Sequence, residues 1–326
     1  MSAYDVRNPL AVRHDRTYAS LVTTTDTTPT TTTAPPTWLP VAAGAVTLVM
    51  WASAFVVIRH VAEDVSPGAL GSGRLLVAAL VVLPLVLRRG WVSPTRREWT
   101  LLALGGIGWF GIYNLALNAG ERHVDAGTAA MIIQIGPVIV ALLAVPLFGE
   151  RMHRWLLGGM VVGFAGVAVI ARGSSTDADA SLVGVLLVLV AAAMYAVGVL
   201  TQKVLLRRLP SVQVVFVSFV MGAVICLPFS RDLPGIVADG GAELWWIVYL
   251  GVLPTAVAFT TWAYALTHTD AGALSLTTFL VPGIATLIAW LTIDEVPPSL
   301  TFVGGALAIV GVLMTRRKPK AADRAS

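Results

Sequence analysis

Charged side chains are scarce in this sequence. Only 12% of its 326 residues are charged and 56% are hydrophobic, whereas about 25% of the residues in a soluble domain are charged. The mean hydropathy of +0.80 agrees with this imbalance. The composition therefore excludes a soluble globular protein and favours a chain that lies largely within a membrane.

Cysteine is almost absent, and histidine is absent from the apolar runs. The one cysteine, Cys226, lies inside an apolar run and cannot form an internal disulfide. None of the five histidines falls inside a predicted membrane span, and the chain has no H-E-x-x-H, no G-x-S-x-G and no glycine-rich phosphate loop. These absences argue against a catalytic or metal site, a cofactor and an ATP-driven pump.

Ten apolar segments follow a polar N-terminal stretch. Residues 1–37 are rich in threonine and proline and lack an apolar core, so we predict a disordered tail rather than a signal peptide. Each later segment fits the length of a membrane helix, and we predict an all-α integral membrane protein with ten transmembrane helices. The segments are 38–58, 68–87, 99–119, 126–148, 155–171, 182–202, 212–229, 244–266, 271–293 and 299–315.

The second half of the chain repeats the first. A pattern of D-A-G, proline and glutamate recurs at a constant offset of 145: Asp125 to Gly127, Pro137 and Glu150 match Asp270 to Gly272, Pro282 and Glu295. Earlier positions match with the offset reduced by one. Because each copy holds five helices, the second copy enters the membrane upside down. We therefore predict two inverted five-helix repeats, at 38–172 and 182–317, and a basic tail at 318–326.

Lysine and arginine indicate the orientation. The net charge is +4 and the pI is near 9.5, but the basic residues lie in short loops and form no continuous patch, so we expect no nucleic-acid partner. Most of the 22 lysine and arginine residues would face the cytoplasm if both termini lie inside. The outer loops would hold only Arg59, Arg122, Arg172 and Arg231.

Pro137 and Pro282 fall near the middle of matching apolar runs. Proline removes one backbone hydrogen bond and bends a helix, and irregular backbone is tolerated in a bilayer only where protein or a wet cavity surrounds it. Broken helices at corresponding positions point to a substrate site at the membrane midplane. The alternative is a kink that serves packing alone, since proline is common in membrane helices.

Helical periodicity places several polar and aromatic residues beside these prolines. Gln134 shares a small-residue face with Pro137, and the matching face of 271–293 carries Phe279, Pro282 and Thr286. Such a stripe either lets helices pack closely or lines a cavity. Polar side chains next to the prolines favour the cavity.

A third face carries two amides. Asn114, Asn118 and Glu121 follow one side of 99–119, whereas the matching side of 244–266 carries Phe259. The asparagines need partners in lipid, either from other helices or from water and a ligand. The predicted substrate-binding residues are Trp51, Asn114, Asn118, Gln134, Tyr195, Phe259 and Phe279, and the predicted gating or kink positions are Pro137 and Pro282.

Arg74 lies roughly 9 Å into the second segment at 1.5 Å per residue. An arginine at the centre of a membrane helix costs about 2.5 to 3.5 kcal/mol, and less if it extends toward the interface. Either that extension or a pair with a loop carboxylate such as Asp64 is one interpretation. A bond to a substrate carboxylate is the other.

Four stretches stand in a characteristic order. They are Trp51-Ala-Ser-Ala-Phe55, Pro67 to Arg74, Ala126-Gly127-Thr128-Ala129 through Pro137 to Gly149-Glu150-Arg151, and the repeat from Ala271 to Glu295. Together they resemble the ten-helix EamA-type carriers of the drug/metabolite transporter superfamily, over nearly everything from Trp38 to Arg317. The resemblance implies two inverted repeats around a central cavity, and movement of small metabolites, often amino acids or drugs, usually outward.

The sequence departs from the four-helix multidrug relatives of that family. They carry a membrane-embedded glutamate in the first helix that binds proton and cation, whereas 38–58 contains no carboxylate. No Asp or Glu falls in the central part of any predicted span. We therefore expect facilitated transport, or proton coupling through Glu121 at an outer helix end.

A non-enzymatic secondary transporter is the function predicted from these observations. We expect an exporter of a small metabolite in the cell membrane, with both termini cytoplasmic. The alternatives are a membrane sensor and a membrane-embedded enzyme. A sensor would need a soluble output domain, and an enzyme would need catalytic groups clustered at one depth in the membrane. The expected partners are the lipid bilayer and a small-molecule substrate, and pairing of two copies as a homodimer is left open.

Overall fold

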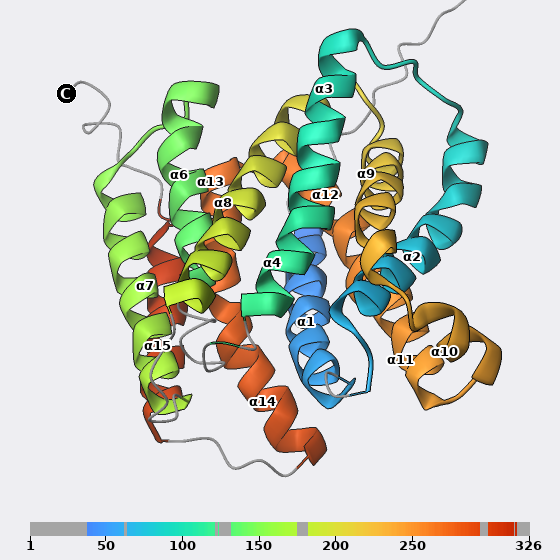
Figure 1. Ribbon diagram of the computed structural model, residues 1–326. Coiled ribbons are helices and arrows are strands. Elements are labelled where there is room, and N and C mark those ends of the chain that lie inside the picture. The colour runs from blue at the N-terminus through green and yellow to red at the C-terminus, as the bar shows by residue number, and fades with distance from the viewer. Residues whose placement is uncertain are drawn as a thin grey trace, which may run out of the picture. The chain divides into compact units, whose positions relative to one another are not determined.

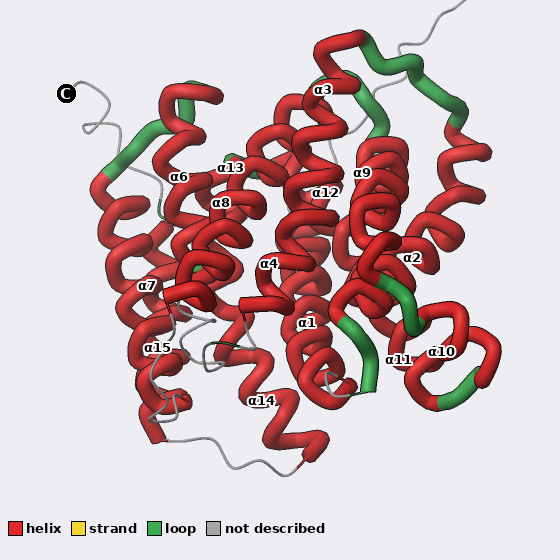
Figure 2. Tube along the Cα trace, viewed as in Figure 1, coloured by secondary structure: helices red, strands yellow, loops and turns green. Residues whose placement is uncertain are grey.

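A computed structural model of the chain describes residues 38–61, 64–120, 123, 132–174, 182–293, 299–315 and 317. These residues form helices and connecting loops, and no strand occurs among them (Figure 2). The all-α prediction is therefore confirmed for this part of the chain. Both predicted tails, Glu121, the Asp125 to Gly127 motif and Glu295 lie outside the described residues.

The helices follow the predicted apolar segments closely. The first half contains α1 (Trp38–Val61), α2 (Pro67–Arg89), α3 (Arg96–Gly105), η1 (Gly106–Ile112), α4 (Tyr113–Gly120), α6 (Ile135–Phe148) and α7 (Arg154–Ser174). The second half contains α8 (Leu182–Leu205), α9 (Ser211–Cys226), η2 (Leu227–Phe229), α10 (Leu233–Asp239), α11 (Ala242–Leu250), η3 (Gly251–Val257), α12 (Ala258–His268), α13 (Ala271–Leu276), η4 (Thr277–Leu280), α14 (Val281–Ile293) and α15 (Ser299–Thr315). The short helix α10 was not predicted.

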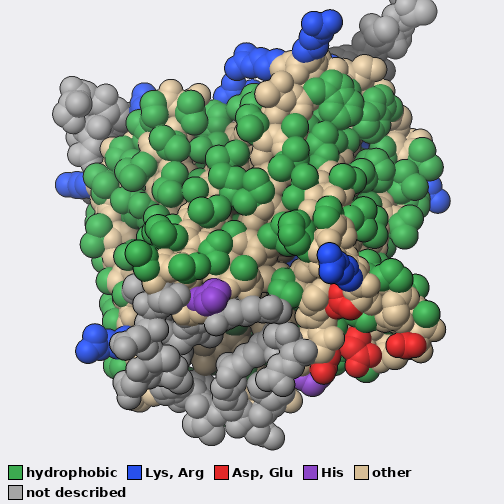
Figure 3. All heavy atoms as spheres, in the orientation of Figure 1, with side chains coloured by type: hydrophobic (Ala, Val, Ile, Leu, Met, Phe, Trp, Pro, Cys, Tyr) green, Lys and Arg blue, Asp and Glu red, His purple; other side chains and the backbone are tan. Residues whose placement is uncertain are grey.

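Among the described residues, eight helical stretches are long and apolar enough to cross a membrane. They run over Trp38–Ile58, Pro67–Arg89, Arg96–Gly120, Arg154–Arg172, Leu182–Leu205, Ser211–Phe229, Ala242–His268 and Ala271–Thr292. Two apolar helices, α6 and α15, are shorter. Hydrophobic side chains cover the visible face in a broad band, while Lys and Arg gather along its upper edge and Asp and Glu at its lower right (Figure 3). This is the surface of a multi-pass membrane protein.

Local sequence signals set several helix ends. The Ser66 hydroxyl accepts a hydrogen bond from the Ala69 N–H, and Pro67 occupies the first turn of α2, where its missing N–H costs nothing. Thr95 and Glu98 form a reciprocal capping box at the start of α3. Gly149 ends α6 with a φ of 69°, a left-handed conformation that glycine adopts without strain.

Two of the membrane-length stretches contain a π-helix that the sequence analysis did not predict. η1 interrupts Arg96–Gly120 and η3 interrupts Ala242–His268. Their first residues, Gly106 and Gly251, are 145 positions apart, which is the offset of the sequence duplication. Glycines in η1 and Pro254 in η3 weaken the regular helix at these points. π-Helices are rare and occur frequently at functional sites.

The chain also leaves regular helix beside both central prolines, but not by the predicted bend. Gln134 adopts a turn, and α6 begins at the next residue with Pro137 in its first helical turn. In the second half the 3₁₀ segment η4 precedes α14, and Pro282 is the second residue of that helix. Each proline therefore lies where an absent N–H is tolerated, and the break comes just before it.

The closest helix pair, α7 and α15, packs through glycines. They lie side by side in Figure 1. A Cβ atom on Gly304 would lie 2.5 Å from the carbonyl oxygen of Gly166, and one on Gly159 would lie 2.5 Å from that of Gly311. Small residues thus let these two helices approach closely.

This packing predicts a large difference between two adjacent glycines. Gly304→Ala should destabilise the protein by about 1 to 3 kcal/mol because the added methyl overlaps backbone atoms of α7. Gly305→Ala is the matched control, since a Cβ atom there meets nothing within 4 Å. Thermal unfolding of the purified variants in detergent measures the difference. Equal transition temperatures for the two variants would contradict the close approach.

Candidate functional site

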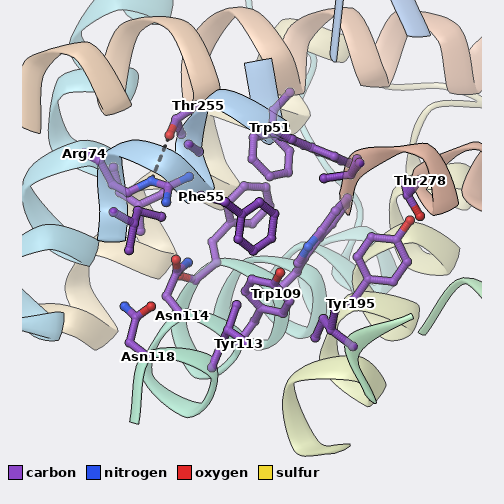
Figure 4. Close-up of a pocket in the computed structure, with 18 of the residues that line it drawn as sticks. Trp51, Phe55, Arg74, Trp109, Tyr113, Asn114, Asn118, Tyr195, Thr255 and Thr278 are labelled. Atoms are coloured by element: carbon purple, nitrogen blue, oxygen red, sulfur yellow. Dashed lines mark hydrogen bonds between the residues drawn. The ribbon is translucent and has the colours of Figure 1, made fainter. Parts of the chain in front are cut away.

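A cavity of about 120 Å³ lies between helices from both halves of the chain. This approaches the volume of an engineered cavity of about 150 Å³ that admits benzene, so a small organic molecule fits its scale. Its lining residues come from α1, α2, η1, α4, α6, α8, η3, α12, η4 and α14 and from the residues that lead into α6. Those labelled in Figure 4 are Trp51, Phe55, Arg74, Trp109, Tyr113, Asn114, Asn118, Tyr195, Thr255 and Thr278.

Irregular backbone supplies much of this lining. Trp109 and Thr255 lie in the two π-helices, and Gln134 and Thr278 lie at the two breaks before the prolines. Backbone of this kind is stable within a bilayer only where protein or a cavity surrounds it. The two π-helices and the two breaks before the prolines therefore meet at one place.

Aromatic rings form one wall of the cavity. The ring of Trp51 lies 5.1 Å from that of Phe259, and the ring of Trp109 lies 5.1 Å from Phe259 and 5.2 Å from Tyr195, measured between centroids. Such pairs stabilise by about 0.5 to 1.5 kcal/mol each beyond their burial. Behind them Trp262 is fully buried, 5.0 Å from Trp51. The wall is rigid and apolar.

The polar groups of the cavity partly serve the irregular backbone. Asn114 Nδ2 donates to the carbonyl oxygen of Phe110 in η1, at 2.8 Å. Gln134 Nε2 donates to the Thr278 carbonyl at 3.3 Å. The Thr278 hydroxyl lies 3.4 Å from Gln134 Oε1 but has its shorter bond, 2.8 Å, to the Ser275 carbonyl. The Gln134–Thr278 contact joins the broken helices of the two halves. The Asn114 and Gln134 side chains therefore each bond to backbone of the protein and also line the cavity.

Arg74 points into the cavity. Its Nε donates to the Thr255 hydroxyl at 3.0 Å (Figure 4). The interpretation that Arg74 extends to the interface or pairs with Asp64 was wrong, because η3 comes close enough to α2 to supply a partner at that depth. A Cβ atom on Gly251 would lie 2.9 Å from the Arg74 carbonyl oxygen, which shows how closely the two backbones approach.

Most of the predicted site residues converge here. Trp51, Asn114, Asn118, Gln134, Pro137, Tyr195 and Phe259 all line the cavity. Phe279 does not: it is fully buried and packs against Phe164 and the position of Gly163 on α7. Pro282 and Thr286 are also absent from the lining. Of the predicted small-residue stripe, Gly272 packs against Ala141 instead of facing the cavity. Whether the lining residues bind a substrate stays a prediction.

Sequence reasoning missed Trp109, Tyr113, Thr255 and Thr278. The faces were drawn at 3.6 residues per turn, whereas the π-helices and the 3₁₀ segment have other periods. The glycine-rich stretch from Gly105 to Gly111 and Pro254 were the available signals of irregular helix.

A second set of polar contacts lies at the loop between α12 and α13. The Glu150 carboxylate accepts hydrogen bonds from the N–H groups of Ala271 at 2.6 Å and Gly272 at 3.0 Å. Lys203 Nζ donates to the carbonyl oxygens of Leu266 at 2.7 Å and Thr269 at 2.6 Å, at the end of α12. Burial raises the pKa of Glu150, while the two N–H donors oppose that shift. Glu150 of the first half thus satisfies N–H groups at the start of α13, and Lys203 of α8 satisfies carbonyl groups at the end of α12.

Apolar membrane-length helices and a cavity bounded by irregular backbone define a multi-pass membrane protein with an internal cavity. Comparison with known proteins places it among membrane transporters. The chain belongs to the EamA-like transporter family, whose model matches residues 38–172 and again residues 182–317.

Individual relatives carry transporter names. The chain is 36% identical over 277 residues to a "Probable terminal-alkyne amino-acid exporter" of Streptantibioticus cattleyicolor, covering 83% of this chain and 91% of that protein. It is 31% identical over 277 residues to the "Uncharacterized transporter YdfC" of Bacillus subtilis, covering 82% and 88%. A crystal structure with 21% identity shares the fold, with a TM-score of 0.73 and coverage of 85% of this chain and 96% of that one.

Loss of the Glu150 carboxylate should loosen α13. Glu150→Ala leaves the Ala271 and Gly272 N–H groups without this acceptor, and loss of a helix cap costs about 0.5 to 2 kcal/mol. We expect faster hydrogen–deuterium exchange in 271–276, with Glu150→Gln intermediate because its amide oxygen still accepts. A peptide from α9 serves as the internal control. Unchanged exchange in 271–276 would show that the cap does not stabilise the helix.

Proposed function

We propose that this chain is a secondary transporter that exports a small metabolite, such as an amino acid or drug-like compound, across the cell membrane. The observation that carries this proposal is the cavity, where irregular backbone from both halves surrounds aromatic and hydrogen-bonding side chains. Broken membrane helices that converge in this way are typical of secondary-transporter sites. The printed name of the relative with 36% identity supports outward movement of an amino acid.

The proposed architecture is ten membrane helices in two inverted repeats, at 38–172 and 182–317. The family model matches these two stretches separately, and α6 and α15 would complete the ten spans. Helix pairs also exchange when the halves are swapped: α1 packs on α12 as α8 packs on α4, and α1 packs on α14 as α8 packs on α6. The pairs α2–α9 and α7–α15 join equivalent helices. This exchange supports a pseudo-two-fold relation.

Alternating access would then use the two copies in turn. Glu150 and Lys203 cap helix ends beside the α12–α13 loop, and the duplication places Glu295 and Arg59 at the equivalent sequence positions. We propose that the two copies change conformation in turn as the cavity opens to either side. No carboxylate lies among the described lining residues, so the proposed movement is facilitated, with Glu121 as the candidate for proton coupling.

Topology is testable by cysteine labelling. Cys226→Ser gives a cysteine-free background, and Ser175→Cys in the predicted outer linker should then react with an impermeant thiol reagent in intact cells. Ser93→Cys, in the predicted cytoplasmic loop, should react only after the cells are opened. The expectation follows from the distribution of Lys and Arg. The reverse labelling pattern would overturn the proposed orientation.

Transport itself is testable with purified protein in sealed vesicles. The panel should include L-propargylglycine, a terminal-alkyne amino acid, together with common amino acids, nucleosides and cationic dyes. Asn114→Ala and Gln134→Ala should each weaken apparent affinity about fivefold, which corresponds to the loss of about 1 kcal/mol from one hydrogen bond. Flux is normalised to folded protein, because both side chains also bond to the protein.

Thr286→Ala is the matched control. Thr286 was predicted on a cavity face, but it lies outside the lining and its hydroxyl donates to the Pro282 carbonyl. Its loss should leave affinity unchanged. If Asn114→Ala and Gln134→Ala behave like this control, the cavity is not the substrate site. If the wild type binds compounds but moves none, a sensor rather than a transporter is indicated.

A further inference from the structure

The cavity has a single charged residue among its described lining side chains. Arg74 is that residue, and no Asp or Glu lies with it in the lining. Its described hydrogen bond goes to a neutral group, the Thr255 hydroxyl. An ionisable residue inside a membrane segment is expected to have a partner, either in the protein or in what the protein binds.

The partner residue fixes how Arg74 is held. Thr255 is fully buried, and its hydroxyl donates to the Leu250 carbonyl oxygen at 2.7 Å, a bond made five residues back within the π-helical stretch. That donation leaves the Thr255 oxygen as the acceptor for Arg74 Nε. Arginine has five N–H donors, so the four on its terminal nitrogens remain for another acceptor. The π-helix therefore fixes one edge of the guanidinium and leaves its fork free for the cavity.

The surroundings of the fork restrict what it can bind. In Figure 4 Arg74, Thr255, Asn114 and Asn118 lie on one side of the cavity, and rings including Trp51 and Trp109 occupy the middle of the view. A guanidinium fork matches a carboxylate through two parallel hydrogen bonds. One guanidinium balances one negative charge, whereas a phosphate monoester brings about −1.5 to −2 and would leave excess charge among apolar groups.

We propose that Arg74 binds the carboxylate of the transported compound, which is therefore a small amino acid with one carboxylate and an apolar side chain. Thr255 orients the guanidinium, and Trp51, Trp109 and Phe259 cover the apolar part. The assignment rests on the proposed transport function, because it names the substrate class of the same cavity.

Binding to the purified full-length protein in lipid nanodiscs tests the assignment. The probes are L-propargylglycine and its carboxamide, which keeps the size and the alkyne but lacks the anion, and the readout is calorimetry. The wild type should bind the acid at least tenfold more tightly than the amide. Arg74→Gln should lower affinity for the acid at least tenfold and remove the preference, without weakening binding of the amide.

Further variants distinguish the contribution of the paired guanidinium hydrogen bonds from that of the positive charge. Arg74→Lys keeps the charge but loses the paired hydrogen bonds, so its preference for the acid should fall between those of the wild type and Arg74→Gln. Thr255→Val should also reduce the preference, because Nε loses its acceptor and the fork its orientation. Arg172→Gln, an exposed arginine at the end of α7, is the control and should behave as the wild type does.

The outcomes distinguish this assignment from the transport function. Equal binding of acid and amide by the wild type, or unchanged acid affinity in Arg74→Gln, overturns the assignment even if vesicles show flux. If acid binding depends on Arg74 but the vesicles show no flux, the assignment of Arg74 is supported and the transport function is contradicted. If the wild type binds neither the acid nor the amide, the assignment of this substrate class is overturned. Should Arg74→Gln not fold, the acid-to-amide ratio of the wild type and of Thr255→Val still decides.

Discussion

Backbone hydrogen bonding in the bilayer is the constraint on which this structure depends. Lipid offers no partner for an unpaired N–H or C=O group, yet η1, η3 and η4 interrupt three of the membrane-length stretches, and the chain also leaves regular helix at Gln134, just before α6. Two contacts between the halves supply partners near the breaks: Gln134 bonds to the Thr278 carbonyl, and Glu150 accepts from the first two N–H groups of α13. Within the second half, Lys203 donates to carbonyls at the end of α12. The Gln134 and Glu150 contacts therefore also join the two halves.

The cavity follows from the same interruptions. A π-helix admits an extra residue per turn and turns the side chains on one side of it relative to those on the other. η1 in this way brings Trp109 and Phe110 to the aromatic wall, and η3 brings Thr255 to Arg74. The cavity is therefore built from positions where helix geometry fails, while the regular parts of the same helices form the packed core behind it.

The same physics explains how far sequence reasoning reached. Apolar length predicts the helices and the 145-residue offset predicts where the irregular points recur, since both depend only on composition and spacing. Face assignments held where the helix stays regular, as for Asn114 and Asn118 in α4. The face assignments failed where the helix period changes. A shift of one residue turns a side chain by about 100° around an α-helix. At η4 such a shift places Thr278 in the cavity lining and Phe279 in the core behind it.

Divergence within the duplication has a consequence for recognition. Asn114 in the first half corresponds at the 145-residue offset to Phe259 in the second, and both line the cavity. Trp51 and Tyr195 are likewise related and likewise present in the lining. Similar backbones thus present an amide at one position and an aromatic ring at its equivalent. In the proposed transport cycle, equivalent packing of the two halves lets them exchange conformations at little cost, whereas unlike side chains give a bound molecule one preferred orientation. On that proposal, similar backbones serve movement and different side chains serve selectivity.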